Sequence, residues 1–207
     1  MNIMKRGRLK THDFYRERVN SQLKRFLDSI QSTSSSKDRL KDIMKYSALA
    51  NGKRFRPILT YTVASLYDVT IEKVDSCACA IELIHIYSLI HDDLPVMDDD
   101  DIRHNQPTIH KVYGEAQAIL AGDALQALAF QVISNDPLLD YETKVKLLVL
   151  LSESSYKMAE GQSIDLSIVS QNVELDLLNE MHKKKTGALL GCAITVSYTH
   201  LTLPTKA

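Results

Sequence analysis

The chain has 207 residues, of which 44% are hydrophobic and 25% are charged, and its formal net charge is −1. This length suits one domain with a substantial core. No stripe of basic residues interleaves with aromatic ones, so the composition argues against nucleic acid as a partner. Purely apolar runs such as 147–151 are far too short to span a bilayer, so we expect no membrane-spanning helix.

The pattern of apolar residues predicts an all-α protein. Only seven glycines and five prolines occur, and long stretches repeat apolar residues at helical spacing without strand-like alternation. We expect amphipathic helices over 14–30 and 38–50, joined by a Ser- and Thr-rich linker over 29–37, with Gly52 as the left-handed C-cap of the second helix. Further helices are expected over 58–67, 74–91, 116–133 and 141–159. Apolar residues on nearly every side of 116–133 predict a helix that is buried all round.

The cysteine pattern indicates a reducing compartment. Cys77, Cys79 and Cys192 form neither a disulfide framework nor a metal-binding spacing, so we expect small core residues in a cytoplasmic protein. The first ten residues carry four basic side chains, but no apolar segment follows them. We therefore expect no secretory signal, and a transit peptide remains a weak alternative.

A basic turn precedes the third expected helix. Lys53, Arg54 and Arg56 lie just before Pro57, a favourable first residue of a helix. The free N–H groups of that helix would then face the same place as the cations, an unfavourable arrangement unless an anion lies between them. The turn therefore predicts an anion site, and the alternative is a solvated basic turn.

An acidic segment follows the helix expected over 74–91, with six aspartates among residues 92–101. Carboxylates at the C-terminal end of a helix meet the negative end of its dipole, so a nearby cation is expected. Asp92 and Asp98 would point to different sides of an unbroken helix, but Pro95 should end the helix and let Asp98 return toward Asp92. Such oxygen-rich sites suit Mg²⁺ together with a phosphorylated ligand. The alternatives are a solvated acidic loop and a calcium loop, although the EF-hand template is not matched.

The segment 88–103, SLIHDDLPVMDDDDIR, resembles the first aspartate-rich motif of the trans-isoprenyl diphosphate synthases, or polyprenyl synthetases, in the DDxxxxD form of bacterial farnesyl diphosphate synthases. The resemblance covers about residues 14–194 and implies a helical bundle of the isoprenoid synthase type. It implies a homodimeric prenyltransferase that condenses isopentenyl diphosphate with dimethylallyl or geranyl diphosphate by metal-assisted ionisation, giving farnesyl diphosphate. It also implies Mg²⁺ bound by Asp92, Asp93 and Asp98.

The same resemblance implies two sets of diphosphate ligands. Residues 52–57 are similar to the family motif GKRxRP, which implies that Lys53 and Arg56 bind isopentenyl diphosphate. His85 alone would be read as a packing residue, but it matches a diphosphate-binding histidine. Arg103 matches an arginine that binds the allylic diphosphate. The next position usually holds a second arginine, and His104 there predicts weaker, more pH-sensitive binding of isopentenyl diphosphate.

Three later features extend the expected site. Tyr87 lies at the depth where similar proteins close the pocket for the hydrocarbon tail, so we expect it to stop the product at fifteen carbons. Residues 160–165 are close to the GQxxD element, which implies that Gln162 and Asp165 are pocket residues. Lys185 and Thr186 match a KT pair that contacts the allylic diphosphate, whereas a lysine run ending a helix would otherwise be ordinary dipole complementarity. The expected catalytic group is Asp92, Asp98, Arg103 and Lys185.

A second aspartate-rich motif, expected further along in this family, is absent from the sequence. We expect residues 1–196 to form the N-terminal part of one synthase domain, incomplete at its C-terminus. Residues 197–207 show no helical pattern and are expected to be an artefactual tail. The alternative functions are a geranylgeranyl diphosphate synthase and a catalytically incomplete diphosphate-binding or regulatory subunit. A squalene-synthase-like bundle would not explain the basic turn at 52–57.

Overall fold

The computed structural model describes residues 2–31 and 39–199, and this part of the chain is a bundle of helices with one two-stranded hairpin. The all-α prediction is confirmed. The helices, in chain order, are α1 (Asn2–Ser29), α2 (Arg39–Ala48), α3 (Phe55–Leu66), the 3₁₀-helix η1 (Ile71–Val74), α4 (Asp75–Asp92), α5 (Ile109–Tyr113), α6 (Glu115–Ser134), α7 (Tyr141–Ser167), α8 (Leu175–His182), the π-helix η2 (Lys183–Gly187) and α9 (Ala188–Thr199). The strands β1 (Ile102–Arg103) and β2 (Gln106–Pro107) pair antiparallel.

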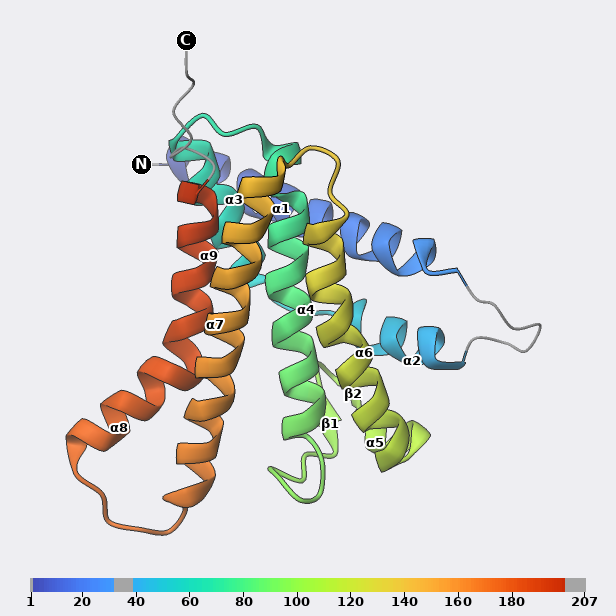
Figure 1. Cartoon of the computed structure of the whole chain (residues 1–207), viewed down its shortest axis with the longest axis vertical. Coiled ribbons are helices and arrows are strands. Elements are labelled where there is room, and N and C mark those ends of the chain that lie inside the picture. Colours follow the sequence, from blue (N-terminus) through green and yellow to red (C-terminus); the bar gives the residue numbers. More distant parts are fainter. Residues whose placement is uncertain (1, 32–38, 200–207) are drawn as a thin grey trace.

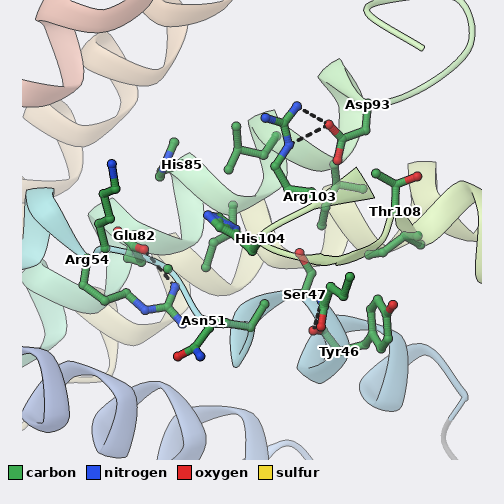
Figure 2. A pocket seen from close by; sticks show the side chains of 18 of the residues that line it. Tyr46, Ser47, Asn51, Arg54, Glu82, His85, Asp93, Arg103, His104 and Thr108 are labelled. Carbon is green, nitrogen blue, oxygen red and sulfur yellow. Dashed lines mark hydrogen bonds and ion pairs between the residues drawn. The ribbon is translucent and has the colours of Figure 1, made fainter. Parts of the chain in front are cut away.

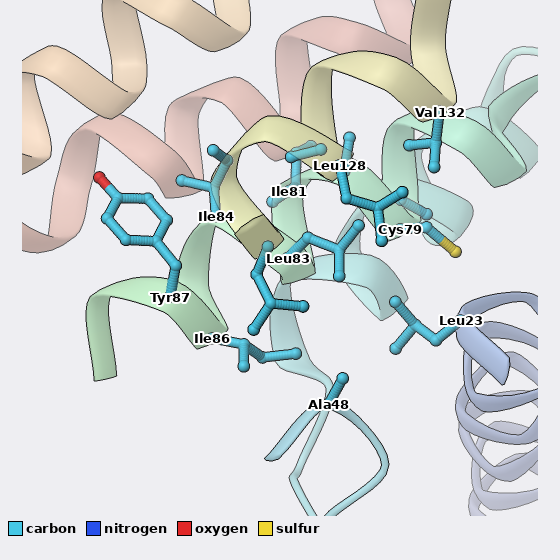
Figure 3. Packing of buried hydrophobic residues seen from close by; sticks show 14 of the residues in the cluster. Leu23, Ala48, Cys79, Ile81, Leu83, Ile84, Ile86, Tyr87, Leu128 and Val132 are labelled. Atoms are coloured by element: carbon cyan, nitrogen blue, oxygen red, sulfur yellow. The ribbon is translucent and has the colours of Figure 1, made fainter. Parts of the chain in front are cut away.

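Helix α4 is the centre of the bundle. It packs most extensively on α6 and also contacts α3, α9 and α1, with α7 and α9 lying beside it (Figure 1). Its side chains Ile81, Leu83 and Ile84 are fully buried, and Leu23 of α1 and Leu128 of α6 pack in the same cluster (Figure 3). Full burial of such a side chain contributes about 1.5–3 kcal/mol. The core therefore holds the C-terminal end of α4 in a defined place.

The two central helices are more apolar than their short apolar runs indicate. The helical stretches Ile71–Asp92 and Glu115–Ser134 are long and apolar enough to cross a membrane by length and composition alone. The most apolar window of Ile71–Asp92 is 78% buried inside the fold, and that of Glu115–Ser134 is 44% buried. The prediction that 116–133 is buried all round is wrong, because Ile119 and Leu120 of α6 are 45% and 51% exposed.

Helix boundaries differ from the expected ones around the basic turn. Helix α3 begins at Phe55, so Pro57 is its third residue, still within the turn whose N–H groups lack intrahelical partners. Gly52 is not the left-handed C-cap that we expected, because the left-handed residue is Arg54, with φ of 52°. All three cysteines are free and buried, which confirms their place in the core.

The C-terminal part also differs from the prediction. Helix α7 continues to Ser167, so the segment 160–165 is helical. The boundary expected at residue 196 falls inside α9, where Ser197 is buried and its hydroxyl donates to the carbonyl of Thr60 at 2.8 Å. Residues 32–38 of the expected linker and residues 200–207 of the expected tail lie outside the described part of the chain.

Candidate functional site

The acidic segment turns back on itself directly after α4. Helix α4 ends at Asp92, and Pro95 lies in the turn that follows. The N–H of Asp98 donates to the carbonyl of Asp92 at 2.8 Å, and the N–H of Asp99 donates to the carbonyl of Leu94 at 3.2 Å. The predicted reversal of the chain between Asp92 and Asp98 is confirmed.

Two cavities lie beside this end of α4. One has a volume of about 520 Å³ (Figure 2), and its polar lining includes Lys53, Arg54, Glu82, Asp93, Arg103 and His104. We call it the Lys53 cavity. The other has a volume of about 720 Å³, and its polar lining includes Asp92, Gln162, Ser163, Lys185 and Thr186. We call it the Asp92 cavity. Arg56, His85 and Leu89 line both cavities. The predicted ligands therefore fall into two neighbouring spaces, except Asp98, which lines neither of them.

The neighbouring residues Asp92 and Asp93 line different cavities, because successive side chains on a helix diverge by about 100°. Asp93 is buried and accepts hydrogen bonds from Arg103 Nε at 2.9 Å and Nη2 at 2.5 Å. Burial raises the pKa of Asp93, although the hydrogen bonds from Arg103 oppose this change. Asp93 is therefore engaged by Arg103 and does not face the predicted metal partner Asp92.

Arg103 is bound to two carboxylates of the acidic segment. Its Nη2 donates to Asp100 at 2.6 Å as well as to Asp93, so one guanidinium ties the acidic loop to the end of α4. It lines the Lys53 cavity, whereas Lys185, its expected partner, lines the Asp92 cavity. The hairpin of β1 and β2 explains this position, since it returns the chain along the Lys53 side.

Arg54 is a structural residue that the sequence analysis left without a role. Its side chain is 2% exposed and its Nη1 lies 2.9 Å from Glu82, which is 4% exposed (Figure 2). Its remaining nitrogens donate to Asn20 Oδ1 at 2.8 Å and to the carbonyls of Ala48 and Ala50 at 2.7 and 2.8 Å. The middle cation of the basic turn therefore connects α1, α2 and α4, and leaves Lys53 exposed and Arg56 beside both cavities.

Arg56 and His85 line both cavities and have few anionic partners. Burial lowers the pKa of Arg56, and its buried Nε has no hydrogen-bond partner in the described part of the chain. Burial, followed by Arg56 and Arg54, lowers the pKa of His85 to about 3. Burial, followed by Arg54 and Arg103, also lowers the pKa of His104, so this side chain carries less charge near neutrality than we expected. An anion would offset the repulsion among these groups.

The Asp92 cavity contains unsatisfied polar groups. Gln162 is buried, and neither its Nε2 nor its Oε1 finds a partner among the residues that the structure describes. Burial raises the pKa of Asp92 to about 6, with Lys185 lowering it and Asp98 raising it. Lys185 itself donates to Asp165 Oδ2 at 2.5 Å. A half-buried carboxylate beside other carboxylates fits a divalent cation, and the oxygen donors of Asp92 and Asp98 suit Mg²⁺.

Part of the lining of the Asp92 cavity is apolar, formed by Tyr87, Met97, Met158 and Leu166. Tyr87 is buried, as its predicted place at the pocket floor requires, and its hydroxyl lies 3.2 Å from Ser155 Oγ. The cavity thus joins a polar end to an apolar wall, a shape that suits an amphiphilic ligand with a charged head.

Lys185 and Thr186 lie in the π-helix η2, which connects α8 to α9. The lysine run therefore continues into a helix, and the alternative of simple dipole complementarity at a helix end does not apply. A Cβ at Gly161 of α7 would lie 2.1 Å from the backbone N and 2.6 Å from the Cα of Lys185. Gly161 permits this approach and was missed in the sequence. The available signal was a lone glycine inside a helical segment, which often marks close backbone contact.

Comparisons with known proteins agree with this architecture. Residues 37–206 match the family model described as Polyprenyl synthetase. The chain is 40% identical over 185 residues to a farnesyl diphosphate synthase of Haemophilus influenzae, covering 88% of this chain and 63% of the relative. It is 40% identical over 182 residues to the Escherichia coli farnesyl diphosphate synthase, covering 86% and 60% respectively. The chain therefore spans about three fifths of the length of these curated relatives.

Solved structures show the same fold. A geranyltransferase from Legionella pneumophila superposes with a TM-score of 0.87 at 38% identity, covering 92% of this chain and 67% of that one. A geranyltranstransferase from Thermotoga maritima gives a TM-score of 0.80 at 34% identity, covering 90% and 67%. The fold is thus the all-α bundle of the isoprenoid synthases. The chain belongs to the polyprenyl synthetase family.

Proposed function

We propose that this protein is a trans-prenyltransferase that condenses isopentenyl diphosphate with dimethylallyl or geranyl diphosphate to give farnesyl diphosphate. The Asp92 cavity carries the proposal, because it combines an apolar wall with a carboxylate, a lysine and an amide that has no partner in the described part of the chain. The names of the relatives, farnesyl diphosphate synthase and geranyltranstransferase, support the same reaction class.

The residues divide into two binding groups. Lys185, Thr186 and Gln162 bind the diphosphate of the allylic substrate in the Asp92 cavity. The second substrate, isopentenyl diphosphate, lies against Lys53, Arg56, His85 and His104. Arg56 and His85 line both cavities, so they connect the two sites. Arg103, expected to share charge with Lys185, instead positions the acidic loop through Asp93 and Asp100.

Asp92 and Asp98 are the proposed ligands of Mg²⁺. When bound there, the ion supplies positive charge that stabilises the departing diphosphate. Lys185 adds a second positive charge on the same side of the cavity, close enough to lower the pKa of Asp92. The apolar wall around Tyr87 and Met158 excludes water from the allylic carbocation until the double bond of isopentenyl diphosphate attacks it. The new carbocation formed by this attack then loses a proton to give the longer allylic diphosphate.

We propose a cytoplasmic homodimer. The three free, buried cysteines are consistent with a reducing compartment. The exposed Ile119 and Leu120 on α6 offer apolar surface for a second copy of the chain.

The test measures binding and turnover separately with the full 207-residue chain. Titration with geranyl diphosphate should show binding that depends on Mg²⁺ and weakens at least about tenfold in Lys185→Ala, since a charge-assisted hydrogen bond contributes about 1.5–3 kcal/mol. Lys184→Ala is the matched control, because Lys184 pairs with Glu160 and Glu180 and does not line the Asp92 cavity. Arg56→Ala should weaken the binding of isopentenyl diphosphate in the same assay.

Mass spectrometry of the products then identifies the reaction. Farnesyl diphosphate as the main product supports the proposal, and geranylgeranyl diphosphate supports the alternative chain length. Tight binding of both substrates without product supports a diphosphate-binding subunit. If neither substrate binds in the presence of Mg²⁺, the proposed function is wrong.

A further inference from the structure

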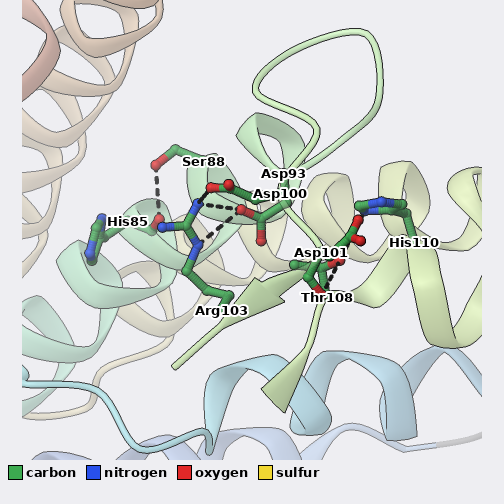
Figure 4. A network of polar contacts seen from close by, with 8 residues as sticks. All are labelled: His85, Ser88, Asp93, Asp100, Asp101, Arg103, Thr108 and His110. Carbon is green, nitrogen blue, oxygen red and sulfur yellow. Dashed lines mark hydrogen bonds and ion pairs between the residues drawn. The ribbon is translucent and has the colours of Figure 1, made fainter. Parts of the chain in front are cut away.

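A second group of possible metal ligands lies at the far side of the acidic loop. Asp99, Asp101 and His110 each place a ligand atom within 4.8 Å of the others. Figure 4 shows Asp101 and His110 on the opposite side of the loop from His85 and Ser88. Asp99, Asp101 and His110 are not among the lining residues of either cavity described above. The group includes neither Asp92 nor Asp98.

His110 is held in one orientation by its neighbours. Thr108 Oγ1 lies 3.2 Å from His110 Nδ1, and the N–H of Thr108 donates to the carbonyl of Asp101 at 3.0 Å (Figure 4). The imidazole is only 8% exposed, and its Nε2 is buried without a hydrogen-bond partner in the described residues. An unpaired nitrogen in such a place lacks the partner that buried polar groups normally have. The missing partner and the two nearby carboxylates indicate a cation.

We propose that Asp99, Asp101 and His110 form a binding site for Zn²⁺ or a similar first-row divalent ion. A proton on Nδ1 donated to Thr108 Oγ1 leaves the lone pair of Nε2 for the metal, the arrangement that orients most metal-binding histidines. One imidazole and two carboxylates select such an ion over Mg²⁺, which prefers oxygen ligands alone. Three protein ligands leave a coordination position for water.

The site joins the acidic loop to helix α5, which already share the hydrogen bond from the Thr108 N–H to the Asp101 carbonyl. Asp99 and Asp101 belong to the exposed acidic loop, while His110 is in the short helix α5. A bound ion therefore ties the loop to α5. The ion competes with Lys111, whose Nζ lies 2.7 Å from Asp101 Oδ1 at an exposed position, while the second oxygen of Asp101 remains available.

Isothermal titration of the full chain with ZnCl₂ tests the site, in excess MgCl₂ that occupies the site proposed at Asp92 and Asp98. Wild-type protein should bind Zn²⁺, and Asp99→Asn should weaken this binding at least tenfold while leaving the buried His110 in place. Lys111→Ala should strengthen binding severalfold, because it removes the competing cation. Asp123→Asn, at another exposed carboxylate, and Asp92→Asn, at the proposed Mg²⁺ site, should bind Zn²⁺ as the wild type does.

Nitrogen-15 NMR of the histidine rings provides a second measurement. Zn²⁺ should shift the Nε2 resonance of His110 in the wild type and in Asp92→Asn, but not in Asp99→Asn. Equal Zn²⁺ affinity in Asp99→Asn and the wild type would overturn the proposal. So would an unshifted His110 resonance at saturation, or the loss of Zn²⁺ binding in Asp92→Asn.

Discussion

The two cavities beside α4 differ in how their charges are satisfied. Around the Lys53 cavity, Arg54 is paired with Glu82 and Arg103 with Asp93 and Asp100. In the Asp92 cavity, Lys185 is paired with Asp165, but Gln162 has no partner among the described residues and burial raises the pKa of Asp92. Paired groups hold the backbone in place, whereas unpaired buried groups lower stability until a ligand satisfies them. The comparison separates the residues that build the site from those that are free to bind.

Removing Arg54 should have the largest effect on folding. Arg54→Ala leaves Glu82 buried without its partner, and breaking such a pair typically lowers the free energy of unfolding by about 3–5 kcal/mol. Chemical denaturation measures this change. Lys53→Ala is the matched control on the adjacent exposed residue and should stay within about 0.5 kcal/mol of the wild type. Equal stability of the two variants would contradict the structural role of Arg54.

Gly161→Ala should disturb the Asp92 cavity specifically. The added Cβ meets the backbone of Lys185, so η2 must move, at a cost of about 1–3 kcal/mol. We expect weaker binding of geranyl diphosphate together with nearly unchanged binding of isopentenyl diphosphate. Gly191→Ala is the control, because a Cβ there meets no atom within 4 Å and alanine favours the helix α9. Unchanged affinity for geranyl diphosphate in Gly161→Ala would refute the positioning role.

Replacing Gln162 should change stability and ligand binding in opposite directions. Gln162→Met keeps a similar shape but removes two buried polar atoms that have no partner among the described residues. Thermal or denaturant unfolding should therefore show a gain in the free energy of unfolding of about 1–2 kcal/mol. The same change should weaken the binding of geranyl diphosphate. Gln171→Met, at an exposed helix-flanking position outside the cavity, is the control for a general effect of methionine. A variant that is less stable but binds normally would show that Gln162 only fills the core.

Tyr87 should control product length, and removal of its hydroxyl alone should have the smallest effect on stability. Tyr87→Phe loses the contact with Ser155, worth about 0.5–1.5 kcal/mol, but keeps the ring and the fifteen-carbon product. Tyr87→Ala opens the floor of the cavity and should lengthen the product, as measured by chromatography of the hydrolysed alcohols. An unchanged chain length in Tyr87→Ala would exclude this residue as the stop.

Much of the fold was predictable from local patterns. Helical periodicity identified the segments that became α3, α4, α6 and α7, because a buried helix needs apolar residues at the spacing of its turns. The reversal after Asp92 was predictable from Pro95, since proline restricts the residue before it and interrupts the helix. The exposure of Ile119 and Leu120 on α6 was not predictable. An apolar sequence does not show which side of the helix remains uncovered by other helices.

The site itself depended on contacts between distant segments. The division of Asp92 and Asp93 between two cavities follows from the rotation of α4 within the bundle. Gly161 meets Lys185 only because α7 and η2 pack together. Local sequence determined the helices, the turn at Pro95 and the residue types offered to a diphosphate. Tertiary packing alone decided which of those charges became buried ion pairs and which remained available, because burial and pairing depend on what the rest of the chain places beside each group.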